Sequence, residues 1–515
     1  MQPMQISNRG FSYWCERAVI ACIFLIAVFA PHSIAATQTA WLLGLFFWIL
    51  RLFIYPRPAL FRTPVDYLLL GFFVLSGVSG VFSYSPIMSI GKMRAASLFT
   101  IVYLVAQNVR TVRLAHVLAL TLIGSCMVNV IWTAGQIVIG RGVRVEGVKA
   151  ESPLAKAIFR TRTVTQPTAI RDGDILWAVN GKPIGNPDEL AAALAGGAGI
   201  KPGETAVAKV RIYRVEWMPE LEVPRAALLP GNSALEQLGI TGWSRGRDWR
   251  ATGFFGHWVT YAEVLQLVAS LALGLFLALP RKRSSSGTML GVAVVGLVFA
   301  LAMTVTRASW IGFAVSGALM LALSVSRRTL LIAGACVIPL VLGAVILLQQ
   351  KRNVGFFDAR DQSTSWREMV WREGFQLLVS NPRHLLVGVG IDSIKGHWRE
   401  WGLFDNGRQP IGHMHSNLLQ IALERGVPAL IVWLLLLAVY AYTLIRVLRI
   451  KDLPPESRGL ALGALGALTG FFVSGLVHYN WGDSEVVTVF YLIMGLSLVV
   501  ERSVRSQSQT SASSG

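Results

Sequence analysis

Two histidines in the second half of the chain, His413 and His415, have a type and spacing suited to proton transfer. They stand two residues apart in the run IGHMHSNLLQIALERGVPALI, just before a strongly apolar segment. A lone histidine is usually a satisfied structural residue, but a neutral imidazole is also the commonest general base near pH 7. Zinc needs three or four ligands, and no carboxylate, cysteine or third histidine stands nearby in the sequence. The pair therefore favours general-base chemistry over a metal site.

Arginines at several further positions suit the binding of a phosphate group. Arg307 lies in TVTRASWIGF between two apolar runs, where an ionised side chain costs about 2.5–3.5 kcal/mol at the centre of a span and needs a partner. Arg367 lies in DQSTSWREMVWREGFQLLVSNP, whose apolar residues recur at helical spacing. Arg245, Arg247 and Arg250 stand beside aromatic residues in SRGRDWRATGFFGH. Guanidinium groups bind phosphate well. The alternative for Arg307 and for Arg245, Arg247 and Arg250 is anchoring at the level of the lipid headgroups, and the alternative for Arg367 is a position facing water.

The turn LVHYNWGDSE, between the last two apolar runs, adds His478, Asn480 and Asp483. Asp483 suits the orientation of an imidazole or an arginine, and it suits equally well the capping of the final helix. The sequence contains neither HExxH nor GxxxxGK[ST]. We therefore expect neither a zinc nor a nucleotide cofactor.

The elements that must position these residues are membrane helices. Hydrophobic residues make up 53% of the chain and charged residues 15%, and the mean hydropathy is +0.54, which is typical of a membrane protein. A bilayer core needs roughly 20 apolar residues per helix. This predicts an all-α polytopic membrane protein with about twelve transmembrane helices. The expected spans lie near 18–36, 38–54, 64–84, 94–109, 114–139, 258–279, 288–304, 307–325, 329–349, 428–446, 459–477 and 486–500.

The charge distribution predicts the orientation of these spans. The formal net charge is +19, but the Lys and Arg residues form short clusters, such as RKR at 281–283, on alternate sides of consecutive spans. Positive-inside bias then places both termini in the cytoplasm and the loops 140–257 and 350–425 in the periplasm of a bacterial inner membrane. Lys92 and Arg94 fall on the outer side in this scheme. The Ala-rich residues 35–40 also resemble a signal-peptide cleavage site, but we favour an uncleaved first span.

The first large outer loop contains a sequence that resembles a bacterial PDZ domain over residues 142–215. The carriers are ESPLAKA, IRDGDILWAVNGKPIGNPDELAAAL and KPGETAVAKVRIYR. Here Gly173 and Asp174 would turn the chain into the strand ILWAV, and Asn180-Gly181 would close a hairpin. The resemblance implies a small α+β insert that binds extended peptide ends by strand addition; the alternative is a spacer module.

These patterns divide the chain into six parts. They are residues 1–141 with transmembrane helices 1–5, the PDZ-like periplasmic insert 142–215, a periplasmic linker with helices 6–9 at 216–349, the large periplasmic loop 350–425, helices 10–12 at 426–501, and a disordered cytoplasmic tail at 502–515.

Outside the insert, the chain resembles the family of O-antigen ligases and O-antigen polymerases, which are membrane glycosyltransferases. The carriers are TRASW with Arg307, WREMVWREGFQLLVSNP followed by LLVGVGIDSI with Arg367, HMHSNLLQIALERGVPALI with His415, and RATGFFGH with Arg250. Members often have Asn after this histidine, whereas Ser416 stands here.

The resemblance implies transfer of a glycan from undecaprenyl pyrophosphate to an acceptor hydroxyl, with lipid A-core favoured, at the periplasmic face. Neither nucleotide sugar nor metal would be required. By position, Arg307 and Arg367, together with Arg250, would hold the pyrophosphate, and His415 would take the acceptor's proton. His413, Asp483 and Arg247 would support the site. Attack opposite the leaving group then predicts inversion at the anomeric carbon.

Other functions use the same features. A polymerase that joins two lipid-linked glycans and a transferase that glycosylates proteins would use the same residues. A polysaccharide transporter should carry polar residues deep within several spans, whereas the polar residues noted above collect at the outer ends. A sensor whose insert reads peptides is a further alternative.

Overall fold

A computed structural model describes residues 2–513 apart from 56, 161–164, 196–206, 215–217, 226–227, 248–249, 327, 329–361 and 410. The chain forms two compact units. Unit 1 comprises Met1–Ile131 and Ala251–Gly515, and unit 2 is Trp132–Arg250. The span expected at 329–349 lies outside the described residues.

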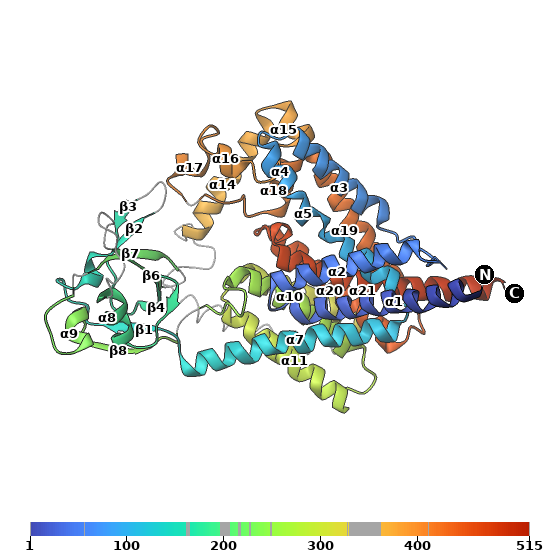
Figure 1. Cartoon of the computed structure of the whole chain (residues 1–515), viewed down its shortest axis with the longest axis horizontal. Helices are drawn as coiled ribbons and strands as arrows, with labels where there is room; N and C mark the ends of the chain where they lie inside the picture. Colours follow the sequence, from blue (N-terminus) through green and yellow to red (C-terminus); the bar gives the residue numbers. More distant parts are fainter. Residues whose placement is uncertain are drawn as a thin grey trace. The chain divides into compact units, whose positions relative to one another are not determined.

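Unit 1 is built from membrane helices (Figure 1). Among the described residues, ten helical segments are long and apolar enough to cross a bilayer, which confirms the expected all-α polytopic class. They are α1 (Gln2–Phe29), α2 (Ile34–Phe53), Pro86–Asn108, α7 (Val112–Ile139), α10 (Trp258–Ala278), α11 (Ser285–Met303), α12 (Arg307–Ser324), α19 (Val427–Leu448), α20 (Pro455–Gly475) and α21 (Ser484–Ser513).

Two expected spans differ from the prediction. The run expected at 64–84 forms α3 (Asp66–Val81), a shorter apolar helix. The run expected at 94–109 begins earlier, at Pro86, and is broken into the pieces named next. They are α4 (Pro86–Gly91), α5 (Met93–Ala96), the 3₁₀ turn η1 (Ser97–Phe99) and α6 (Thr100–Asn108).

Helices α10 and α20 form the centre of unit 1 and pass very close to each other. A Cβ atom added to Gly274 of α10 would lie 2.2 Å from the backbone nitrogen of Gly463 in α20. A Cβ added to Gly463 would lie 2.8 Å from the Cα of Leu271. Small residues allow such close backbone approach between membrane helices, where packing replaces the hydrophobic effect. In α20, little space for a side chain remains beside Gly459, Gly463, Gly466 and Gly470.

Residues 362–425, the described part of the second predicted outer loop, fold into short helices at the end of unit 1 away from the chain termini (Figure 1). They are α14 (Gln362–Val379), α15 (Pro382–Val387), α16 (Ile394–His397), α17 (Leu403–Gly407) and α18 (Asn417–Arg425). Their shared core includes Val370, Phe404 and Met414. The Asn381 side chain accepts from the Arg383 amide at the start of α15, so Asn381-Pro382 separates α14 from α15.

The glycines of the VGVG turn pack this loop against α18. Gly388 (φ 74°) and Gly390 (φ 99°) have left-handed backbones, which glycine adopts without steric cost. The amide of Gly390 donates to the Glu424 carbonyl at 2.9 Å. Lys92 Nζ pairs with Asp392 Oδ2 at 2.8 Å, so this outer cation has a protein partner.

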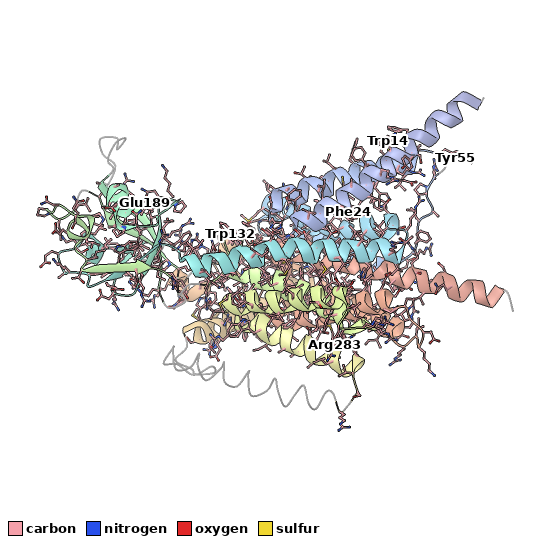
Figure 2. The ribbon with its side chains drawn as sticks, turned by 90° about the horizontal axis from the view of Figure 1, so that it is seen from below. Trp14, Phe24, Tyr55, Trp132, Glu189 and Arg283 are labelled. Carbon is pink, nitrogen blue, oxygen red and sulfur yellow. The ribbon has the colours of Figure 1, made fainter. Side chains whose placement is uncertain are left out.

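Aromatic side chains mark the end of unit 1 where the chain termini lie. Trp14 and Tyr55 are 69% and 73% exposed, and both lie toward this end (Figure 2). Trp and Tyr are enriched at the interfaces of membranes. The N-terminus and the C-terminus lie at the same end of the unit (Figure 1).

Unit 2 is a mixed α/β unit with its own apolar core. Its sheet has the strand order β3-β2-β7-β6-β4-β1-β8, with β5 paired to β4, and every pairing described is antiparallel. Residues such as Leu176, Leu190 and Val210 are fully buried in its core. The strands are β1 (Val143–Glu146), β2 (Ile158–Arg160), β3 (Thr165–Pro167), β4 (Ile175–Val179), β5 (Lys182–Pro183), β6 (Val207–Tyr213), β7 (Glu220–Pro224) and β8 (Gly242–Arg245).

Two local features of unit 2 follow from its sequence. Asn180 (φ 50°) and Gly181 (φ 79°) form the tight turn between β4 and β5, as an Asn-Gly pair favours. At the start of helix α8 (Pro187–Ala195), Glu189 Oε2 accepts a hydrogen bond from the Gly185 amide at 2.6 Å. Glu189 is labelled in Figure 2. The other helical pieces are η2 (Pro153–Lys156) and α9 (Ala234–Leu238). The PDZ-like identity of residues 142–215 stays a prediction.

Candidate active site

A buried carboxylate in α10 organises one end of the central helices α10 and α20. Glu263 has 1% of its surface exposed. Its Oε1 accepts hydrogen bonds from Ser309 Oγ at 3.2 Å and from His478 Nδ1 at 2.9 Å. Its Oε2 accepts from Ser474 Oγ at 2.7 Å and from Asn480 Nδ2 at 3.2 Å. These four donors fill the acceptor positions of a carboxylate and join α10 to α12, α20 and the turn after α20.

The same turn is bonded to the start of α18, directly after the histidine pair. The Nδ2 of Asn417 donates to Asn480 Oδ1 at 2.6 Å, and the Trp481 amide donates to Asn417 Oδ1 at 3.1 Å. Asn417 is 1% exposed. The segment that carries His415 is therefore fixed to the network of Glu263 through two buried amide side chains.

The two predicted histidines lie against each other in this segment. The ring centroids of His413 and His415 are 4.0 Å apart. The His415 amide donates to His413 Nδ1 at 3.2 Å, so in its neutral form His413 carries its proton on Nε2. His415 has a left-handed backbone with φ 47°. A non-glycine residue there is uncommon, and such strain is concentrated at functional sites.

Their surroundings keep both imidazoles neutral. Burial, followed by the charges of His478, Lys395 and His257, lowers the pKa of His413 to about 4. Burial, followed by His413, His478, Arg367 and His257, lowers the pKa of His415 to about 2. Four histidines and one arginine thus interact electrostatically at this site. A cation on His415 is strongly disfavoured, and its lone pair is available across the physiological pH range.

Helix α14 brings Arg367 to the histidines. The Trp366 ring meets the His415 ring edge-on, with centroids 4.5 Å apart, and the next residue, Arg367, contributes to the lowered pKa of His415. Trp371 Nε1 donates to the Met414 carbonyl at 2.8 Å. Helix α14 is therefore attached to the His413–His415 segment at two points.

Arg307 begins α12, the helix whose Ser309 joins the network. It is half-buried and is the first residue of that helix, after a strained Val305 with φ 50°. Ser309, two residues later, donates to Glu263. The positive end of a helix and a guanidinium group both favour an anion. The first turn of α12 therefore offers positive charge beside the buried polar network.

Asp483 performs more than one of the roles considered for it. Its Oδ1 accepts from the Glu485 amide at 3.2 Å, which caps α21. Its Oδ2 accepts from Thr260 Oγ1 at 2.6 Å, and that hydroxyl lies 3.4 Å from His257 Nδ1. Its charge also opposes the lowering of the His413 pKa. Asp483 thus orients part of the histidine cluster and caps the helix.

Arg250 and Arg247 belong to unit 2. Arg250 is half-buried and Arg247 is exposed. Arg250 directly precedes Ala251, whose amide donates to the Met303 carbonyl at the end of α11 at 2.9 Å. The roles predicted for these two arginines therefore rest on the sequence.

A second buried charge network supports the far end of α18. Arg425 Nη1 pairs with Glu424 Oε2 at 2.9 Å, and Tyr479 OH donates to the same oxygen at 3.1 Å. Glu424 Oε1 accepts from the Asp392 amide at 2.9 Å. This network joins α18 to the VGVG turn and to the turn that carries His478.

Sequence analysis did not single out Glu263, His257 or the Glu424–Arg425 pair. The signal for Glu263 was present, because it is the only acidic residue of the apolar run 258–279, and ionisable residues within spans are functional candidates. The described residues contain no group of three or more His, Cys, Asp or Glu side chains arranged to hold a metal ion.

The matched segment of a known family covers part of this site. The family model described as O-antigen ligase matches residues 292–434, from α11 to the first part of α19. This range includes Arg307, Arg367, His413 and His415, while Glu263 and His478 lie outside it. No curated protein matches the chain. The match confirms the resemblance to O-antigen ligases over residues 292–434, and the long apolar helices are those of a multi-pass membrane protein.

Proposed function

We propose that this protein moves a glycan from undecaprenyl pyrophosphate to an acceptor hydroxyl, with lipid A-core as the favoured acceptor. The family implies a membrane glycosyltransferase or ligase. The observation that carries the proposal is the position of His415, a neutral imidazole held in a strained backbone between Trp366 and His413 and within the field of Arg367.

The arginines act on the leaving group. When the bond between sugar and diphosphate breaks, its electron pair goes to the diphosphate, and negative charge increases there. Arg307 and Arg367 stabilise this charge through positioned guanidinium groups, which act more strongly where water is excluded. From the sequence resemblance, Arg250 would also hold the pyrophosphate and Arg247 would support the site.

His415 acts on the acceptor. Its low pKa leaves the imidazole unprotonated and able to accept a hydrogen bond from the acceptor hydroxyl. A bound diphosphate adds negative charge close to Arg367 and opposes the effect of that arginine on His415. The imidazole therefore becomes a better proton acceptor when the donor is present. Attack from the face opposite the diphosphate inverts the anomeric carbon, and no metal takes part.

The reaction takes place at the periplasmic face of a bacterial inner membrane, with both termini in the cytoplasm and the first span uncleaved. Residues 142–215 form a PDZ-like module that binds a peptide or protein end. Residues 216–349 are the linker with its helices, and residues 350–425 are the large periplasmic loop. Residues 502–515 form a cytoplasmic tail. Clustered Lys and Arg between alternate spans support this orientation.

Replacement of His415 tests the proposed base. Purified protein in lipid nanodiscs would be given an undecaprenyl-pyrophosphate-linked glycan and lipid A-core, and the product would be followed by mass spectrometry. We expect His415→Ala and His415→Asn to lose about 10²–10⁴-fold in rate. Asn tolerates a left-handed backbone better than Ala. If both variants lose the same rate, the loss comes from the missing imidazole and not from a disturbed backbone. Unchanged transfer by both variants would eliminate His415 as the base.

The acceptor is tested with the same donor. A second lipid-linked glycan or a protein acceptor would replace lipid A-core in parallel reactions. Product on the second glycan indicates a polymerase, and product on protein indicates a protein glycosyltransferase. Movement of the lipid-linked glycan across the membrane without a new glycosidic bond would indicate transport and contradict the proposal.

A further inference from the structure

Glu263 raises a question of charge, because a carboxylate is costly to bury in a membrane span. Ser309, Ser474 and Asn480 would satisfy a neutral amide at this position as well as a carboxylate, and polar contacts of that kind are enough to join membrane helices. The partner for which a full negative charge matters is His478, whose Nδ1 lies 2.9 Å from Glu263 Oε1. The imidazole is 6% exposed.

This contact fixes the protonation pattern of His478. An ionised carboxylate accepts hydrogen bonds and does not donate them, so His478 carries a proton on Nδ1 and, when neutral, a lone pair on Nε2. A carboxylate in this position stabilises the imidazolium that forms when Nε2 takes a second proton. The residue after His478, Tyr479, has its ring centroid 5.5 Å from that of His413, and the charge of His478 acts on both His413 and His415.

The other members of the cluster are poor places to leave a proton. His415 faces the charges of His413, His478, Arg367 and His257, and His413 faces those of His478, Lys395 and His257, with Asp483 opposing them. The Thr260 hydroxyl lies between His257 and Asp483. His478, in contrast, has the Glu263 carboxylate bonded directly to its ring.

We propose that Glu263 and His478 form a positioning pair that receives the acceptor's proton from His415 and holds it during glycan transfer. The proposal rests on the transferase function and goes beyond it. The acceptor O–H bond breaks as the new glycosidic bond forms, and the proton passes through His415 to His478 Nε2. The electron pair of the broken sugar–oxygen bond stays on the diphosphate. The imidazolium beside Glu263 releases its proton to water when the products leave.

Two substitutions separate this role from simple packing. Glu263→Gln keeps the size and a carbonyl acceptor but removes the charge. His478→Asn keeps a donor N–H in the position of Nδ1, and so preserves the bond to Glu263, but deletes Nε2. The matched control is Glu501→Gln, since Glu501 is also a buried carboxylate (4% exposed) that binds Arg446 and Arg505. Glu501 lies about 25 Å along α21 from Ser484, the first residue of that helix.

The measurement is the pH dependence of kcat for transfer from undecaprenyl-pyrophosphate-linked glycan to lipid A-core, with the donor KM. For Glu263→Gln we expect kcat to fall about 10–100-fold with the donor KM unchanged. We also expect the acid limb of the profile to move to lower pH, because the pair that holds the proton loses its negative charge. For His478→Asn we expect a loss of about 100-fold or more and no donor-KM change. Glu501→Gln should keep the wild-type limb.

The outcomes distinguish this proposal from the function on which it rests. If wild type and Glu501→Gln transfer the glycan while Glu263→Gln keeps the wild-type acid limb, the proton-holding role is wrong and the transferase function stands. If Glu263→Gln does not give monodisperse protein that binds donor, His478→Asn decides, and a wild-type kcat there overturns the pair. If wild type itself transfers glycan to no acceptor, the proposed function is the one that fails.

Discussion

At the scale of single residues, His415 combines two properties that are costly for folding. Its backbone is left-handed, and burial, together with neighbouring cations or potential cations, lowers the pKa of its imidazole to about 2. A residue selected for stability alone would have neither property. Both costs are understandable if the site is arranged for an anionic ligand that is absent from the free protein.

The lowered pKa values predict acid sensitivity. Free histidine has a pKa of about 6.5, whereas folding lowers that of His413 to about 4 and that of His415 to about 2. Below pH 6.5 the unfolded chain therefore binds protons that the folded chain does not bind. Stability from this source is present above pH 6.5 and decreases as the pH falls, by about 2 kcal/mol per histidine at pH 5.

Thermal unfolding in detergent at pH 7.5 and pH 5 measures this effect. We expect His413→Gln and His415→Asn each to show a smaller drop in Tm on acidification than the wild type, and the double variant to show the smallest. An equal drop in all four proteins would contradict the assigned pKa values.

At the scale of elements, the contact between α10 and α20 determines the site geometry. Glu263 lies on one of these helices, while Ser474 lies on the other and His478 follows it by a few residues. Their hydrogen bonds require the two backbones to approach as closely as Gly274 and Gly463 allow. The glycines of α20 are therefore part of the machinery that positions the buried pair, although they are far from the chemistry.

A methyl group at this contact should disturb the site. Gly463→Ala places a Cβ 2.8 Å from the Leu271 backbone, and such overpacking costs about 1–3 kcal/mol. We expect a lower Tm together with reduced transfer, because α20 moves relative to Glu263. Gly124→Ala in α7 is the matched control, since no atom lies within 4 Å of its added Cβ. Loss of activity in both variants, or in neither, would argue against this role of the close contact.

The elements also separate what the sequence predicts from what it does not. Length and hydropathy were enough to predict α10, α19 and α20, because each is a continuous apolar run. They could not predict the break into short pieces between Pro86 and Asn108, where polar and apolar residues alternate without a clear boundary.

The candidate site shows the same division. The sequence segments that carry Arg307, Arg367 and His415 could each be identified from the sequence. The Glu263–His478 pair joins residues 215 positions apart, and proximity of that kind arises only from helix packing. Hydropathy analysis treats an acidic residue in a span as an interruption, and it contains no information about which distant side chain neutralises the charge.

At the scale of the whole molecule, the helical bundle gives the membrane protein two chemically different ends. The chain termini lie at the end marked by Trp14 and Tyr55 (Figure 2). The short helices of the second outer loop lie away from the termini (Figure 1). The positive-inside rule assigns the terminal end to the cytoplasm.

Cysteine labelling tests this orientation. Among the described cysteines, Cys15, Cys22 and Cys126 are buried, and all four cysteines of the chain would be replaced by serine. We expect a membrane-impermeant maleimide to label Glu400→Cys, at a residue whose side chain is 67% exposed, in intact spheroplasts. Arg283→Cys, in the exposed turn after α10, should be labelled only after the membrane is opened. The reverse order of labelling would mean that the site faces the cytoplasm.

The strand pairing within unit 2 has a consequence for the engineering and evolution of such proteins. Its first strand, β1, pairs with its last, β8, so that Val143 lies opposite Arg245. Paired strands lie about 5 Å apart, and the two ends of the unit therefore leave it side by side, as in a cassette. A foreign domain with adjacent ends, such as a fluorescent reporter, can occupy the same place in the chain without stretching either junction.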